Sequence, residues 1–164
     1  MSWPDPVSRV SEFLREAKGE ATIEEFPEGT PTAAAAAKAV GVDEAQIVKS
    51  LVFVCDGLPV LALIPGDRRA DGDKIAAAVK ARESRVATAD EVRAATGFAP
   101  GAVAPFPPSS VVEVLIDRSL LSHDAVWVGA GSPNHMARLR PAELLRLSRA
   151  RQMDAVADRN YHSG

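Results

Sequence analysis

Residues 47–64 read IVKSLVFVCDGLPVLALI, and they form the most strand-like part of the chain. Apolar and β-branched side chains fill two runs that are separated by Asp56 and Gly57. Two such runs joined by an Asp-Gly pair are typical of a β-hairpin. We therefore predict paired antiparallel strands over 47–55 and 58–64.

Lys49 is the residue of this hairpin that apolar packing does not explain. Side chains alternate between the two faces of a strand, so Lys49 points the same way as Leu51 and Phe53. Val48 and Ser50 point the opposite way. A lysine among apolar side chains costs free energy unless its ammonium group reaches a partner or a solvated cleft. Lys49 is therefore either a functional cation in a cleft or a lysine that extends to water at the strand end.

Short helices and strands are expected on both sides of the hairpin. Capping residues, helical periodicity and glycine stops predict helices over 6–17, 33–40, 71–79, 89–96 and 141–147. In the first of these helices, Asp5 is the expected N-cap residue. Weaker apolar runs predict strands over 22–26, 111–116, 125–128 and 136–139, with loops over 100–108 and 129–134.

This order of elements predicts the α+β class, with a mixed, mostly antiparallel, curled sheet flanked by short helices. The chain has 164 residues, of which 46% are hydrophobic and 25% charged, as is typical of one compact globular domain. We expect residues 1–150 to form that single domain and residues 151–164 to form a polar C-terminal tail that frays.

Composition excludes several classes of protein. A formal net charge of −3 argues against non-specific binding to DNA. Cys55 is the single cysteine and the three histidines show no metal-ligand spacing, so we expect no disulfide, metal or cofactor. No apolar stretch approaches the roughly 20 residues that cross a bilayer, and residues 1–6 lack the pattern of a secretion signal. A cytoplasmic protein without membrane contacts is therefore expected.

Two glycine-containing segments are candidate binding elements. In the first, Gly101 permits close approach of a ligand to the backbone, while Ala102, Pro105 and Phe106 follow in a loop whose path proline restricts. The second, residues 129–131 (Gly-Ala-Gly), follows a strand and could present amide donors to a phosphate or carbonyl oxygen. For the first segment a structural turn is the commoner interpretation. The second lacks the complete dinucleotide-binding or Walker spacing, so it shows only that a ligand could fit.

The remaining candidates are one histidine and a basic segment. His135 lies beside the second glycine segment and has a stronger claim to a role than His123, which is expected to be a solvated loop residue. No serine stands in a nucleophile-elbow pattern, which disfavours a serine hydrolase. A basic segment is either a solvated face or a patch for a few RNA phosphates; it contains Arg68, Arg69, Lys74, Lys80, Arg82 and Arg85.

Taken in order, these residues resemble the YbaK/prolyl-tRNA-synthetase-associated domain family, over about Thr30 to Leu147. Each matching segment is unspecific alone, whereas their order and spacing together are specific. The segments are Thr32 with the alanine-rich helix ending at residues 40–42, then residues 46–53, 65–69, 96–98, 101–106, 116–117 and 129–131.

The resemblance implies a free-standing aminoacyl-tRNA deacylase, related to the editing domain inserted in bacterial prolyl-tRNA synthetases. It implies hydrolysis of the ester of a misacylated small amino acid (Ala, Cys, Ser or Thr), chiefly on the tRNA for proline, in the service of translation fidelity. The family's essential lysine matches Lys49. The implied partners are the 3′-terminal aminoacyl-adenosine of mischarged tRNA and prolyl-tRNA synthetase. Implied substrate contacts are Thr32, Ser50, Gly101, Ala102, Pro105, Phe106, Gly129, Ala130, Gly131 and His135.

An aminoacyl ester is already activated, so such a site needs mainly to orient it, admit water and stabilise charge on the carbonyl oxygen. We hypothesise that Lys49 holds the terminal adenosine or the aminoacyl group, and that backbone amides near Gly101 and residues 129–131 face the carbonyl. In this hypothesis the substrate's own 2′-hydroxyl activates the water. His135 is the less favoured candidate for the role of base. A non-catalytic module that binds a tRNA end or a nucleotide is the alternative, and a general esterase is a weaker third.

Overall fold

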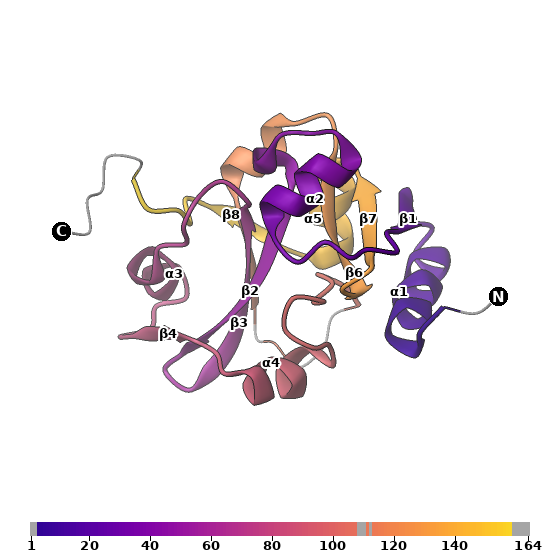
Figure 1. Cartoon of the computed structure of the whole chain (residues 1–164). Coiled ribbons are helices and arrows are strands. Elements are labelled where there is room, and N and C mark those ends of the chain that lie inside the picture. Colours follow the sequence, from indigo (N-terminus) through magenta and orange to yellow (C-terminus); the bar gives the residue numbers. More distant parts are fainter. Residues whose placement is uncertain (1–2, 108–110, 112, 159–164) are drawn as a thin grey trace.

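The computed structural model describes residues 3–107, 111 and 113–158, and it contains two β-sheets with helices packed on them (Figure 1). The smaller sheet has the strand order β1-β7-β6, and the larger sheet has the order β4-β2-β3-β5-β8. The strands are β1 (Ala21–Glu25), β2 (Val48–Cys55), β3 (Leu58–Pro65), β4 (Ser84–Val86), β5 (Glu113–Asp117), β6 (Val126–Ser132), β7 (His135–Leu139) and β8 (Arg151–Met153).

The predicted hairpin is confirmed as β2 and β3. Their antiparallel register runs from Val48 opposite Pro65 to Cys55 opposite Leu58. The predicted alternation also holds, because Val48 is buried in the larger apolar core whereas Phe53 is buried in a second core on the other face of the sheet. The hairpin therefore separates the two cores and fixes which way every side chain of β2 points.

The predicted α+β class with mostly antiparallel pairing is confirmed. Among the described residues, β3 with β5 and β5 with β8 form parallel ladders, and the other ladders are antiparallel. The single expected sheet is instead divided in two. The two sheets meet at one isolated bridge between Ile47 and Trp127, and this seam is where the candidate site lies.

Helices cover the sheets, and most of their ends follow from local sequence. Thr32 caps α2 by accepting a hydrogen bond from the Ala35 N–H at 3.0 Å, and Gly41 ends that helix in the left-handed conformation. The first helix begins one residue earlier than predicted, because Pro4 and not Asp5 occupies the N-cap position. The helices are α1 (Asp5–Glu16), α2 (Ala33–Val40), α3 (Gly72–Ala78), α4 (Ala89–Thr96) and α5 (Pro141–Ser148), with 3₁₀ turns η1 (Glu44–Gln46) and η2 (Arg118–Ser122).

The expectation of a fraying tail after residue 150 is wrong for the described part of that segment. Residues 151–153 form β8 on the edge of the larger sheet, and Ala155 and Val156 are buried in the second core. The polar residues of the segment face outward, where Arg151 pairs with Glu113 at 2.6 Å. Residues 159–164, Pro108 and Val112 lie outside the described residues.

Helix α2 closes one side of the seam between the sheets. The buried face of α2 presents Ala36 and Ala37, which pack against Ile47 of the larger sheet and Trp127 and Met136 of the smaller sheet. Small side chains let the helix approach the strands closely. Within residues 3–107, 111 and 113–158, no helix has both the length and the hydropathy needed to cross a membrane.

Candidate functional site

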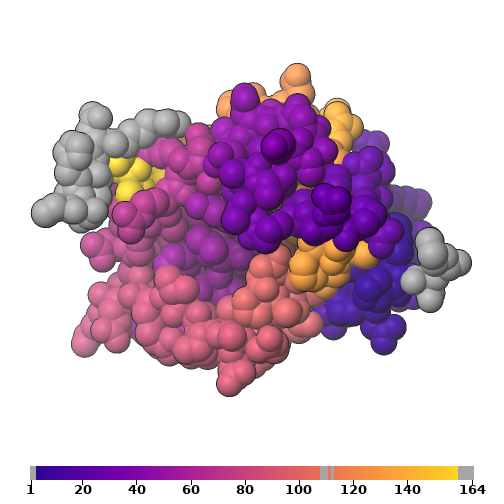
Figure 2. Space-filling view, in the orientation of Figure 1, coloured from indigo at the N-terminus to yellow at the C-terminus, as the bar shows by residue number. Residues whose placement is uncertain are grey.

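A cavity of about 320 Å³ opens at the seam between the two sheets. This volume is at the lower end of the range of about 300–1,000 Å³ that is usual for small-molecule sites. Figure 2 shows the segments around it meeting on one face of the molecule: α2, the loop after α4 and the turn between β6 and β7. The lining residues are Thr30, Pro31, Thr32, Ala33, Ala36, Ile47, Val48, Lys49, Ser50, Leu51, Gly101, Val103, Gly129, Ser132, His135 and Met136.

The cavity lies at an open edge of β2. One edge of β2 pairs with β3 along its whole length. On the other edge, β4 pairs only with Phe53–Cys55, and the bridge to the smaller sheet lies at Ile47. In the described part of the chain no strand pairs with β2 between these two points, and the cavity occupies that gap.

The main-chain groups of β2 alternate between its two edges. The Val52 carbonyl faces the open edge, where it accepts a hydrogen bond of 2.9 Å from the Ala87 N–H beyond β4. Ser50 and Val48 stand two and four residues earlier, so their main-chain groups face the same edge. An edge position also explains why Lys49 and Ser50, whose side chains point to opposite faces, both line one cavity.

The ammonium group of Lys49 brings a positive charge to the cavity. Its Nζ donates a hydrogen bond of 2.6 Å to the main-chain carbonyl of Arg68, in the loop after β3. Burial is the main cause that lowers the pKa of Lys49, with a smaller contribution from Arg69, while Asp67 and Glu44 oppose the shift. Lys49 thus lines the cavity, and its partly buried ammonium group has a protein partner, while its catalytic role stays a prediction.

Ser50 and Thr32 differ in how their hydroxyl groups are used. The Ser50 Oγ is buried and has no hydrogen-bond partner in the described structure. A buried hydroxyl without a partner costs free energy, so a ligand that bonds to it is favoured. The Thr32 Oγ1, by contrast, already accepts the Ala35 N–H as the cap of α2, so this residue first of all fixes the rim of the cavity.

The opposite wall is made of main chain packed against main chain. A Cβ added at Gly129 would lie 2.6 Å from the Val103 carbonyl oxygen, so only glycine fits at this point. The Gly131 N–H donates a hydrogen bond of 3.1 Å to the Ala102 carbonyl. The segment 129–131 is therefore not the loop that the sequence predicts; it lies within β6, where the pairing with β7 is irregular between Gly129 and Ser132.

The predicted substrate contacts divide into two groups. Thr32, Lys49, Ser50, Gly101, Gly129 and His135 line the cavity. The others are buried behind its walls and do not line it: Ala102, Pro105, Phe106, Ala130 and Gly131. Alternation explains part of this result, because Ala130 follows Gly129 in β6 and points the opposite way.

Sequence reasoning missed several lining residues. Ala33 and Ala36 lie three residues apart on one face of α2, and this helical spacing is a signal that could have singled them out. Val103 and Met136 carry no such signal, because apolar residues of this kind are common in any core. Ser132 can be recognised as a site residue only from its contact with His135, which the sequence does not reveal.

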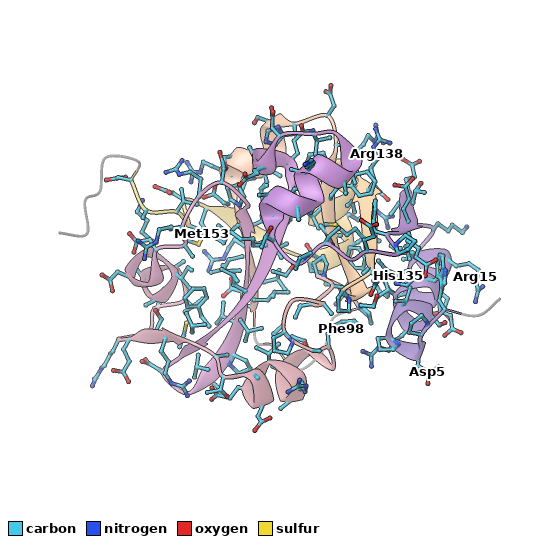
Figure 3. The ribbon with its side chains drawn as sticks, in the orientation of Figure 1. Asp5, Arg15, Phe98, His135, Arg138 and Met153 are labelled. Carbon is cyan, nitrogen blue, oxygen red and sulfur yellow. The ribbon has the colours of Figure 1, made fainter. Side chains whose placement is uncertain are left out.

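His135, which is labelled in Figure 3, has a polar neighbour at each ring nitrogen. Its Nδ1 lies 2.6 Å from the Ser132 Oγ, and its Nε2 lies 3.5 Å from a carboxylate oxygen of Glu25 without forming a hydrogen bond. A hydrogen on Nε2 faces the carboxylate favourably, which assigns Nδ1 as the acceptor of the Ser132 hydroxyl hydrogen. The ring is 2% exposed and contacts Trp3 edge-on at 5.5 Å between centroids. His135 is thus a positioned wall residue and is poorly placed to serve as a base.

The fold and the cavity together define a class: α+β proteins with a small ligand site at the seam between two sheets, with a lysine on one wall and glycines on the other. Residues 27–147 match the family model described as the aminoacyl-tRNA editing domain. The chain therefore belongs to the aminoacyl-tRNA editing domain family, which confirms the resemblance found in the sequence.

Known proteins similar to this chain differ greatly in length. The uncharacterized protein YwhH of Bacillus subtilis (strain 168) is 32% identical over 127 residues, covering 77% of this chain and 80% of that protein. A proline–tRNA ligase of Nitratidesulfovibrio vulgaris (strain DP4) is 36% identical over 107 residues, covering 65% of this chain but only 18% of the ligase. The crystal structure of a candidate trans-editing enzyme for prolyl tRNA synthetase is 37% identical with a TM-score of 0.89, covering 96% of this chain and 100% of that chain. This similarity confirms the editing-domain fold.

Proposed function

We propose that this protein is a trans-acting aminoacyl-tRNA deacylase that removes a small amino acid, Ala, Cys, Ser or Thr, from mischarged tRNA, with the tRNA for proline as the preferred carrier. The observation that carries the proposal is the partly buried Lys49 ammonium group at the edge of a small cavity whose opposite wall is main chain. Membership in the editing-domain family supports the substrate class, aminoacyl-tRNA.

The size of the cavity favours a small acyl group. Its walls include Ala33, Ala36, Gly101 and Gly129, none of which carries a side chain larger than a methyl group. A synthetase pocket built for one amino acid rejects a slightly smaller one by only about 1–3 kcal/mol per missing methylene. A second, smaller site that hydrolyses such errors is the physical remedy, and the small side chains on the wall of this cavity support that role.

The reaction needs little from the protein beyond positioning. Water adds to the ester carbonyl carbon, the bond to the ribose oxygen breaks, and that oxygen takes up a proton as the amino acid leaves. Lys49 supplies positive charge near the developing negative charge, and the unpartnered hydroxyl of Ser50 supplies a hydrogen bond to the bound group. Because both nitrogens of His135 face partners, the neighbouring ribose hydroxyl of the substrate is the better acceptor for the proton of water.

The experiment is a deacylation panel with alanyl-, cysteinyl-, seryl- and threonyl-tRNA, each on its own tRNA and on proline tRNA. We expect turnover for at least one of these amino acids, fastest on proline tRNA. Lys49→Ala is expected to abolish turnover at saturating substrate. Lys38→Ala, which removes an exposed lysine of α2, is the matched control and is expected to keep the wild-type rate.

Two results would overturn this proposal. Tight binding of the tRNA end with no hydrolysis of any substrate in the panel indicates the non-catalytic binding module. Hydrolysis of simple amino-acid esters at the same efficiency as the tRNA substrates indicates a general esterase. Adding prolyl-tRNA synthetase to the same assay tests the second partner, for which we expect a lower KM.

A further inference from the structure

We propose that the C-terminal segment, residues 151–158, positions Lys49 for its role in the site, and that Arg68 is the residue through which it does so. The proposal rests on the proposed function for its catalytic consequence. The structural link itself can be tested without any substrate.

Arg68 contacts both Lys49 and the C-terminal segment. Its main-chain carbonyl accepts the hydrogen bond of 2.6 Å from the Lys49 Nζ. Its guanidinium Nη2 donates a hydrogen bond of 2.6 Å to the carbonyl of Ala157. One residue therefore carries the acceptor that orients the ammonium group and also anchors that acceptor to the C-terminal segment.

The loop around Arg68 is paired with the C-terminal segment through main-chain hydrogen bonds. The Ala157 N–H donates to the Arg69 carbonyl at 2.9 Å, and the Asp71 N–H donates to the Ala155 carbonyl at 2.8 Å. Between these two bonds, Ala70 and Val156 form an antiparallel bridge. The loop is thus extended as a short strand pair, which fixes the path of the main chain next to Arg68.

The C-terminal segment is itself anchored to the fold. The carboxylate of Asp117, which is 2% exposed, accepts the Ala155 N–H at 2.8 Å. Lys74 donates to Asp154 at 2.9 Å and to the Val156 carbonyl at 2.7 Å. Buried and charge-assisted hydrogen bonds fix the C-terminal segment, so this segment can fix the loop around Arg68. A frayed tail could not do so.

The consequence for the site is a dependence of Lys49 on residues outside the region that matches the family model, which ends at residue 147. Without the contacts of the C-terminal segment, the Arg68 carbonyl is no longer fixed, and the ammonium group loses the hydrogen bond that orients it. A displacement of about 1 Å in a positioned group is enough to lower a rate about 100-fold.

The test uses the full chain with three variants. Arg68→Ala removes the anchor, and Arg68→Lys keeps a shorter donor. Ala157→Pro removes the N–H that bonds to Arg69 and leaves the Arg68 side chain intact. Arg151→Ala is the matched control, because this arginine of the same segment bonds to Glu113 and to the Ala78 carbonyl, away from the loop.

The first measurement is the ¹⁵Nζ signal of the Lys49 ammonium group and its exchange with water by NMR. We expect a signal in the wild type and in Arg151→Ala, with faster exchange or loss of the signal in Arg68→Ala and Ala157→Pro. Circular dichroism establishes that each variant is folded. An unchanged Lys49 signal in both folded variants refutes the positioning role, whatever the enzyme activity proves to be.

The second measurement is deacylation kinetics. We expect kcat to fall about 10- to 100-fold in Arg68→Ala and Ala157→Pro with little change in KM, and partial rescue in Arg68→Lys. A higher KM for Arg68→Ala alone, with Ala157→Pro at the wild-type rate, assigns Arg68 to direct contact with RNA phosphate and overturns the proposal. If no variant and no wild-type protein deacylates tRNA, the proposed function fails, while the NMR result still decides the inference.

Discussion

The two walls of the cavity are fixed by different means. The wall at Gly129 is held by short-range packing of main chain against main chain, where a missing Cβ allows the Val103 carbonyl to approach. The wall at Lys49 includes a side chain whose acceptor, the Arg68 carbonyl, is bonded through its own side chain to Ala157 of the C-terminal segment. The Gly129 wall therefore depends on the absence of a side chain. The Lys49 wall depends on contacts between segments that are far apart in the sequence.

This difference separates stability from activity. Main-chain packing stabilises the fold and the site together, so damage to it affects both. The Lys49 wall includes a desolvated cation, which is unfavourable for folding and useful for binding a ligand. The four predictions below test this separation, in order of decreasing effect on activity.

Lys49→Met is expected to lower kcat by at least about 100-fold while leaving the free energy of unfolding equal to or above that of the wild type. Because burial lowers the pKa of Lys49 in the folded state, protonation opposes folding at neutral pH. This cost disappears as the pH rises to the ordinary lysine value of about 10.4, so any stability advantage of the variant shrinks there. Urea unfolding at pH 7 and pH 10 measures the difference in unfolding free energy between the variant and the wild type. A variant that is much less stable than the wild type at pH 7 contradicts the prediction.

Gly129→Ala is expected to damage both properties. The new Cβ would meet the Val103 carbonyl oxygen at 2.6 Å, so the wall must shift, at a cost of about 1–3 kcal/mol in unfolding free energy. We expect kcat to fall about tenfold with it. Gly57→Ala is the control, because this hairpin glycine has a φ of 83° but no atom within 4 Å of the added Cβ. The Gly57→Ala control should lose stability and keep the wild-type kcat. If Gly129→Ala and Gly57→Ala are equally active, the packing at Gly129 does not shape the site.

Ser132→Ala is expected to have a moderate effect on substrate recognition. It removes the hydroxyl group 2.6 Å from His135 Nδ1, so the ring loses one of the two contacts that orient it. We expect KM to rise a few-fold, a stability loss of about 1 kcal/mol, and a change in the histidine tautomer signals by NMR. Ser122→Ala, in the remote turn η2, removes a hydroxyl that donates to the Ser119 carbonyl and should leave KM and the histidine tautomer signals unchanged. Unaltered tautomer signals in Ser132→Ala would count against this contact.

Glu91→Gln is expected to leave deacylation unchanged, because α4 lies outside both walls. The hydrogen bonds from Arg85, together with those from Thr88, lower the pKa of Glu91 to about 2. A carboxylate with a lowered pKa stabilises the fold above its ordinary pKa, and this contribution disappears as the pH falls toward about 2. The variant should therefore melt below the wild type at pH 7, with a gap that closes in acid. Glu12→Gln, an exposed change on α1, controls for the lost charge.

Local signals explain what the sequence could predict of the fold. Three predicted features are present, and each depends on residues within a few positions of one another. They are the Asp56-Gly57 turn, the capping box of Thr88 with Glu91, and the end of α2 at Gly41. Strand β8 depends instead on a distant partner. Residues 151–153 are Arg-Gln-Met, which carry no strand signal and form a strand because β5 offers its edge.

The candidate site follows the same division. Lys49, Gly101 and Gly129 were predictable because a charge among apolar residues, a glycine in a proline-containing loop and a glycine after a strand are visible in sequence. The role of the Arg68 carbonyl was not, because every residue has a carbonyl and only the fold selects one as an acceptor. Phe106 was assigned to the substrate yet is buried in the larger core, since membership in a loop does not say which way a side chain points.

The unpaired stretch of β2 has a consequence for how such a site can diversify. By the alternation of main-chain groups along β2, the amide and carbonyl of Ser50 face this gap whatever side chains surround them. Substitutions at Ala33 or Ala36 would reshape the space available to an acyl group while leaving that hydrogen-bonding capacity intact. The size of the group that the cavity admits can therefore change while the main-chain hydrogen-bonding groups at its edge stay the same.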